Sequence, residues 1–141
     1  MDLLGACNNC GAVFSAPNFI GIGPGVTDVS FQENSTNCPQ CGATARLSDF
    51  HIDGQGKSLL THFLPVLVRP NVTRSELSEL LEFVRREKEK KASAIEVSQA
   101  LEKEQPKFAG LKEHLGTSTD ILTVLDFLSR LIIFIITYIR P

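Results

Sequence analysis

The chain has 141 residues, which is enough for one ordinary domain or two small ones. Hydrophobic residues make up 43% of it and charged residues 21%, so the composition predicts a globular protein and excludes an intrinsically disordered one. The net charge of -2 and the pI of about 5.9 exclude a general electrostatic attraction to nucleic acid or to anionic lipid.

The charged residues are unevenly distributed, and their distribution divides the chain into three parts. Residues 1–70 contain five acidic and three basic residues, and residues 71–118 contain nine of each. Residues 119–141 contain two of each and are otherwise almost entirely apolar. We therefore predict an α+β protein with a β domain over residues 1–70, a small helical domain over residues 71–118, and an apolar C-terminal helix over residues 119–141.

The first part has the pattern of short β-strands separated by turns. We assign the alternating positions Val29 and Phe31 to one short strand, and Ala45, Leu47, Phe50 and Ile52 to another, with Val13 and Phe14 as β structure after the first cysteine pair. The polar stretch from Asn34 to Asn37 predicts a loop. Residues 59–68 are apolar but include Pro65, which predicts an edge strand or a packed connector.

Four cysteines form two pairs, Cys7-Asn8-Asn9-Cys10-Gly11 and Cys38-Pro39-Gln40-Cys41-Gly42. A Cys-x-x-Cys turn presents two thiolates from one tight turn, and Zn²⁺ prefers four such ligands in a tetrahedron. The glycine after each pair can adopt the positive φ that the turn requires. The sequence therefore predicts one structural Zn²⁺ per chain. Its ligands are Cys7, Cys10, Cys38 and Cys41.

The first six residues lack the basic and long apolar regions of a secretory signal, so we expect a cytosolic protein with reduced thiols. The two cysteine pairs, the two glycines and Pro39 resemble the knuckles of the zinc-ribbon family over about residues 5–55. That resemblance implies a small β fold around the metal. Twenty-seven residues separate Cys10 from Cys38, more than the usual ~15–20, so we expect an extra excursion between the knuckles.

Zinc ribbons serve many functions, and the fold alone does not name one. Some bind nucleic acid, but residues 1–70 are net acidic and contain only Arg46, Lys57 and Arg69 as basic residues. We therefore expect nucleic-acid binding to be weak. The sequence offers no recognisable nucleophile, acid–base pair or open metal position, which predicts a protein that is not an enzyme.

The middle part predicts short helices. Thr73 and Glu76 have the Thr-x-x-Glu spacing of a capping box before a helix, and Ser93 and Glu96 repeat that spacing before a second helix at about 94–104. Pro106 ends the second helix. A third short helix follows from the apolar positions Phe108, Leu111 and Leu115.

The last part begins at an N-cap cluster over residues 117–120 and predicts one long helix. Its apolar residues repeat at alternating steps of four and three, which we call the seam: Ile121, Leu125, Leu128, Ile132, Ile135 and Ile139. A narrow polar stripe follows a second line of the helix: Thr123, Asp126, Arg130 and Thr137, extended by Arg140. Asp126 and Arg130 have the i, i+4 spacing that allows an ion pair.

Three interpretations of this helix remain open. It is long enough to span or insert into a membrane, it can bury its seam against copies of itself as an oligomerisation helix, or it is the core helix of the helical domain. A helix this apolar cannot remain exposed to water. We favour a membrane-associated or self-assembling form, with the ribbon at the inner face of the membrane.

These features together predict a non-enzymatic interaction or sensing protein, whose partners are another protein, a membrane or further copies of the chain. The layout of ribbon, helices and membrane-prone tail resembles small bacterial proteins of uncharacterised function. A more specific form of this hypothesis is a membrane-disrupting defence or toxin effector, in which the polar stripe lines a pore. The alternative is a soluble nucleic-acid or transcription-associated ribbon protein.

Overall fold

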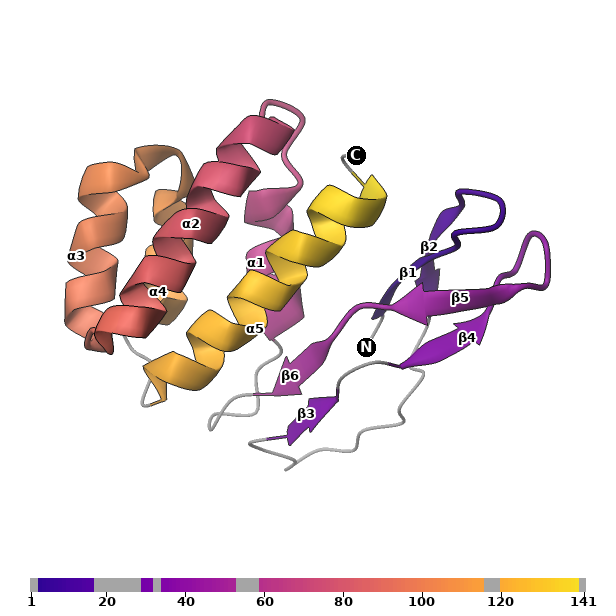
Figure 1. Ribbon diagram of the computed structural model, residues 1–141, viewed down its shortest axis with the longest axis horizontal. Coiled ribbons are helices and arrows are strands. Elements are labelled where there is room, and N and C mark those ends of the chain that lie inside the picture. Colours follow the sequence, from indigo (N-terminus) through magenta and orange to yellow (C-terminus); the bar gives the residue numbers. More distant parts are fainter. Residues whose placement is uncertain (1–2, 17–28, 32–33, 53–58, 116–119, 140–141) are drawn as a thin grey trace.

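The computed structural model describes residues 3–16, 29–31, 34–52, 59–115 and 120–139. Among them, short antiparallel strands lie on one side and a group of helices on the other, and the C-terminal helix lies between the two groups (Figure 1). This arrangement confirms the α+β class that the sequence predicts.

The N-terminal part of the chain forms a four-stranded antiparallel sheet, which we call the ribbon. Its strands are β1 (Leu3–Ala6), β2 (Val13–Ala16), β4 (Ser35–Asn37) and β5 (Thr44–Leu47), in the order β2-β1-β5-β4. The sheet consists of two hairpins, β1–β2 and β4–β5, and the pairing of β1 with β5 joins them. The prediction of a loop from Asn34 to Asn37 is wrong, because backbone pairing with β5 makes Ser35–Asn37 a strand despite its polar side chains.

A second, two-stranded sheet continues from the ribbon toward the helices. It pairs β3 (Val29–Phe31) with β6 (Phe50–Ile52) in antiparallel fashion. Ile52 is buried in the same core as the helices. The strand assignments from the apolar positions are confirmed in β2, β3, β5 and β6, but the stretch from Ala45 to Ile52, predicted as one strand, is divided into β5 and β6, which lie in different sheets.

Residues that the sequence assigned to an edge strand or connector form a helix, α1 (Leu59–Leu67), which contains Pro65. Proline at this position lacks the N–H that would bond to the preceding turn, and its ring crowds the carbonyl four residues earlier, which disfavours a helix. Five apolar side chains at helical spacing hold α1 against the core and outweigh that loss. They are Leu59, Leu60, Phe63, Val66 and Leu67.

The middle helices begin where the capping boxes predict. Thr73 caps α2 (Arg74–Lys90) and Ser93 caps α3 (Ala94–Glu104), each with reciprocal bonds to the glutamate three residues later. After α3, Pro106 begins a 3₁₀ turn, η1 (Pro106–Leu111), which leads into α4 (Lys112–Leu115). The predicted third helix is therefore part 3₁₀ and part α.

The C-terminal helix is α5 (Ile121–Phe134), and it continues as one π-helical segment, η2 (Ile135–Ile139). Asp120 caps it by accepting hydrogen bonds from the backbone N–H and the hydroxyl of Thr123. Residues 117–119, the rest of the predicted cap cluster, lie outside the described residues.

One continuous hydrophobic core takes residues from all three parts of the sequence. β5 and β6 contribute Leu47 and Ile52, and the rest comes from the helices, with α5 packed along α2 and against α1. The seam of α5 faces this core: Leu125, Leu128, Ile132 and Ile135 are each 0% exposed. The described geometry is therefore that of a core helix, the third interpretation of the tail.

Candidate metal centre

Two turns at the end of the sheet remote from the helices carry the four cysteines (Figure 1). In the first, between β1 and β2, the N–H of Cys7 bonds to the carbonyl of Ala12 and the N–H of Gly11 bonds to the carbonyl of Cys7, both at 2.9 Å. The second, between β4 and β5, repeats this pattern from Cys38 to Ala43. We call these turns knuckle 1 (residues 7–12) and knuckle 2 (residues 38–43).

A glycine closes each knuckle. Gly11 has φ 75° and Gly42 has φ 78°, a region that residues with a Cβ rarely adopt. Both values confirm the role that the sequence assigned to the glycine after each cysteine pair. The strand pairs beside the knuckles, Ala6 with Val13 and Asn37 with Thr44, hold the two turns at the same end of the sheet.

The four sulfur atoms all lie within 4.8 Å of one another. The distance between Cys7 Sγ and Cys41 Sγ is 3.6 Å, and that between Cys10 Sγ and Cys38 Sγ is also 3.6 Å. A disulfide requires ~2.05 Å, so the cysteines are free thiols. Four sulfurs at ~2.3 Å from one tetrahedral ion would lie ~3.8 Å apart. The site therefore fits one metal ion.

Burial alternates around the cluster. Cys7 and Cys38, the first cysteine of each knuckle, are 3% exposed, whereas Cys10 and Cys41 are exposed. The buried pair rests on a small apolar cluster of its own, in which Ala45 of β5 is buried. The sheet thus supports one side of the sulfur cluster, and the other side faces the surface.

Polar hydrogens from both knuckles point at the sulfurs. The side-chain amide of Asn9, in knuckle 1, donates to Cys41 Sγ in knuckle 2 at 3.5 Å. Together with the backbone N–H of Ala43, this contact lowers the pKa of Cys41 from 9.0 to about 6. The backbone N–H groups of Cys41 and Gln40 lower the pKa of Cys38 in the same way. Both thiolates are therefore stabilised by protein groups.

Four sulfurs at this separation cannot all ionise without compensation. The backbone N–H of Ala12 favours the thiolate of Cys10, but desolvation and the neighbouring thiols outweigh it and raise the pKa of Cys10 to about 12. A divalent cation supplies the missing charge, because it stabilises all four thiolates together. The donor set therefore suits a bound cation.

Asn9 is the contributor that the sequence interpretation missed. It occupies a variable position of the Cys-x-x-Cys motif, where the spacing demands no particular residue, and its contact crosses from one knuckle to the other. An amide side chain directly before Cys10 was the available signal. Groups of this kind around a metal commonly orient its ligands and tune their basicity.

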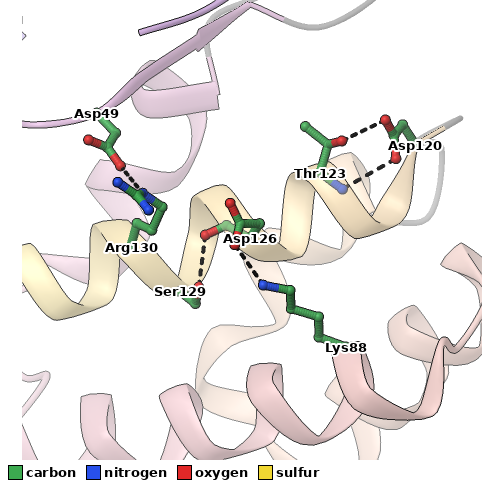
Figure 2. Close-up of polar contacts among 7 residues, drawn as sticks. All are labelled: Asp49, Lys88, Asp120, Thr123, Asp126, Ser129 and Arg130. Atoms are coloured by element: carbon green, nitrogen blue, oxygen red, sulfur yellow. Dashed lines mark hydrogen bonds and ion pairs between the residues drawn. The ribbon is translucent and has the colours of Figure 1, made fainter. Parts of the chain in front are cut away.

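The polar stripe predicted on the C-terminal helix does not form one continuous line of solvent-facing groups. Asp126 accepts from Lys88 of α2 at 2.6 Å, and Arg130 donates to Asp49, which follows β5 (Figure 2). Thr123 bonds to Asp120 at the start of the helix, and Thr137 is exposed. Arg140 lies outside the described residues.

The metal centre has the features of a zinc-ribbon-like motif. Its four cysteines lie on two glycine-closed knuckles beside a small antiparallel sheet. No family model, curated protein or solved structure matches the chain. The likeness to zinc ribbons therefore rests on the knuckles and the sheet themselves.

Proposed function

We propose that the chain is a non-enzymatic zinc-ribbon protein, in which one structural Zn²⁺ fixes two knuckles as an interaction surface for a protein partner. The observation that carries the proposal is the cluster of four sulfur atoms within 4.8 Å of one another. Four thiolates saturate a tetrahedral ion, so no coordination position remains for a substrate or an activated water. Such a sulfur set suits Zn²⁺, with iron as its main competitor.

The chemistry of the knuckle tips favours a protein as the partner. Asn8, Pro39 and Gln40 are exposed and uncharged, and Val13 beside them is 45% exposed. A nucleic-acid interface needs cations that neutralise phosphates. Within residues 3–16 and 34–52 of the ribbon, Arg46 is the one lysine or arginine.

Metal analysis of the full-length protein tests the structural half of the proposal. We expect one zinc per chain by elemental analysis, and Cys41→Ser should abolish it, whereas Asn8→Ser in the same exposed surface should retain it. Because the ribbon core is small, metal binding should supply much of its folding energy, on the order of 10 kcal/mol. Stoichiometric iron, or a ribbon that keeps its amide signals in strong chelator without metal, would contradict the proposal.

Nucleic-acid binding tests the class of partner. We expect the full-length protein to bind short single- and double-stranded DNA or RNA only feebly at physiological salt. Fluorescence anisotropy measures this directly. Submicromolar affinity that falls steeply with salt would replace the proposal with a nucleic-acid-binding ribbon protein.

Membrane association is a second candidate function, and one observation favours it. Ile121–Ile139 is a 19-residue helix that is long and apolar enough to cross a membrane, although half of it is buried inside the protein. In this form the ribbon would lie at the membrane's inner face. Flotation of the full-length protein with phospholipid vesicles distinguishes the two candidates, because a helix held in the core leaves the protein at the bottom of the gradient.

A further inference from the structure

A pocket of about 320 Å³ lies between the ribbon and the C-terminal helix. Its polar wall combines Arg46 of β5, Asp49, and Arg130 and Thr137 from the C-terminal helix. Two arginines against one aspartate leave the wall with one excess positive charge. A volume of this size lies at the lower end of the range for small-molecule sites.

The two arginines differ in their surroundings. Arg130 is paired with Asp49, whose side chain is only 9% exposed. Arg46 is exposed on the central strand β5, and among the described residues none has an ion pair with it within 4 Å. Its guanidinium is therefore the group available to an incoming anion, and its planar fork matches a carboxylate or a phosphate.

The C-terminal helix also lines the pocket with apolar and aromatic side chains. Phe134 and Tyr138 lie one helical turn apart and pack against each other in a tilted arrangement, with ring centroids 4.9 Å apart and planes inclined by 50°. Ile133 also lines the pocket and is 41% exposed. A flat apolar group would cover this exposed surface and stack on the rings.

The helix is irregular at this pocket. Thr137 and Tyr138 belong to the π-helical segment η2, in which the backbone widens relative to α5. π-helical turns are rare and occur frequently at functional sites, because they re-aim side chains at a cost in helix stability. Here the irregular turn coincides with the residues that line the pocket.

We propose that this pocket binds a small organic anion whose carboxylate or phosphate is held by Arg46 and whose flat apolar part lies against Phe134, Tyr138 and Ile133. Such a ligand touches both the ribbon and the C-terminal helix, so its binding stabilises their contact. The pocket requires a folded ribbon, because Arg46 lies on β5, but it does not depend on the protein partner proposed above.

Titration of the full-length, zinc-loaded protein with four probes tests the proposal. Phenyl phosphate and phenylacetate supply both parts of the ligand, inorganic phosphate supplies only the anion, and phenylacetamide supplies only the ring. We expect saturable binding of at least one aryl anion by calorimetry and by amide shifts in residues 44–49 and 133–138, with the better of the two identifying the headgroup. Inorganic phosphate and phenylacetamide should each bind at least about tenfold more weakly, because each lacks one set of contacts.

Variants locate the site. Arg46→Gln should weaken binding of the aryl anion by about 10- to 100-fold, the loss expected for a charge-assisted hydrogen bond. Arg85→Gln, at an exposed arginine of α2, should leave binding unchanged. Tyr138→Ala should weaken binding of the aryl anion but not binding of inorganic phosphate. Retention of one zinc per chain shows that each variant keeps its ribbon.

Three outcomes would overturn the inference. They are no saturable binding of either aryl anion up to about 10 mM, the weak end of small-ligand affinities, equal binding by inorganic phosphate, or equal binding by zinc-loaded Arg46→Gln. A metal analysis that finds no zinc would instead contradict the proposed function, so failure of the inference and failure of the proposed function are distinguishable.

Discussion

Arg130 of the C-terminal helix donates its Nε–H to a carboxylate oxygen of Asp49, 81 positions earlier in the chain. Asp49 follows β5 of the ribbon, and one turn earlier on the same helix Asp126 pairs with Lys88 of α2 (Figure 2). The helix is therefore linked by charge to both the ribbon and the helical group, in addition to the apolar contacts of its seam.

The two ion pairs should differ in strength because they differ in exposure. The side chain of Asp49 is 9% exposed, whereas those of Lys88 and Asp126 are 42% and 40% exposed. We expect a double-mutant cycle between Asp49→Asn and Arg130→Met to give a coupling of about 1.5–3 kcal/mol in urea unfolding. The cycle between Lys88→Met and Asp126→Asn should give about 0.2–1 kcal/mol, lowered further by salt.

The cycle between Lys88 and Asp126 is the matched control, because each cycle removes one ion pair from the same helix. Equal coupling energies in the two cycles would contradict the expectation that the less exposed pair, Arg130 with Asp49, is the stronger one.

The seam should behave as core in water. Leu128 is 0% exposed and packs in the main core, so Leu128→Ala should lower the free energy of unfolding by about 2–5 kcal/mol. Leu122, on the same helix, is 42% exposed, and Leu122→Ala should change it by less than about 1 kcal/mol. Urea unfolding of detergent-free protein, followed by circular dichroism, measures both changes.

Leu128→Asp separates this arrangement from an oligomerisation helix. A charge in the core should unfold the protein, whereas a charge in an interface between copies should release folded monomers. Size-exclusion chromatography with circular dichroism distinguishes the two results, and folded monomers would contradict the core assignment.

The metal centre could be predicted from sequence because its geometry is local. Each Cys-x-x-Cys-Gly segment determines its own turn, and only the approach of the two knuckles depends on the rest of the chain. The starts of α2 and α3 were predictable for the same reason, since each capping box lies within four residues. The contact between Asn9 and Cys41 was not, because it joins side chains 32 positions apart.

The C-terminal helix shows where sequence patterns do not suffice. A stripe of apolar residues predicts that a surface is buried but does not show what covers it. Burial against lipid, against a second copy or against the chain's own helices requires similar apolar residues. The prediction for residues 59–68, an edge strand or a packed connector, likewise relied on Pro65 and missed the helical spacing of the buried positions in α1.

The capping box of α2 should make stability depend on pH. Glu76 accepts bonds from Thr73 and pairs with Lys107 at 2.6 Å, and chiefly the Lys107 contact lowers its pKa from 4.5 to about 2. A lowered folded-state pKa stabilises the protein above pH 4.5, and this contribution is lost as the pH falls toward 2. The difference in unfolding free energy between wild type and Glu76→Gln should therefore be full above pH 4.5 and shrink across that window.

Glu79→Gln serves as the control for removing one negative charge from the same helix, since Glu79 is exposed. Its difference from wild type should vary little over the same range. A difference for Glu76→Gln that is independent of pH between 2 and 4.5 would contradict the assignment.

Asn9 should tune the affinity of the metal centre. Asn9→Ala removes the one side-chain donor from knuckle 1 to Cys41 Sγ that the described residues show, so the pKa of Cys41 should rise from about 6 toward its ordinary value. Protons then compete better for that thiolate, and zinc affinity at neutral pH should fall by about 10- to 100-fold, with zinc released at a higher pH than from wild type. Competition against a chromophoric chelator measures both quantities. Asn8→Ala, at the adjacent exposed position, is the matched control, and equal affinities of the two variants would show that the amide does not support the site.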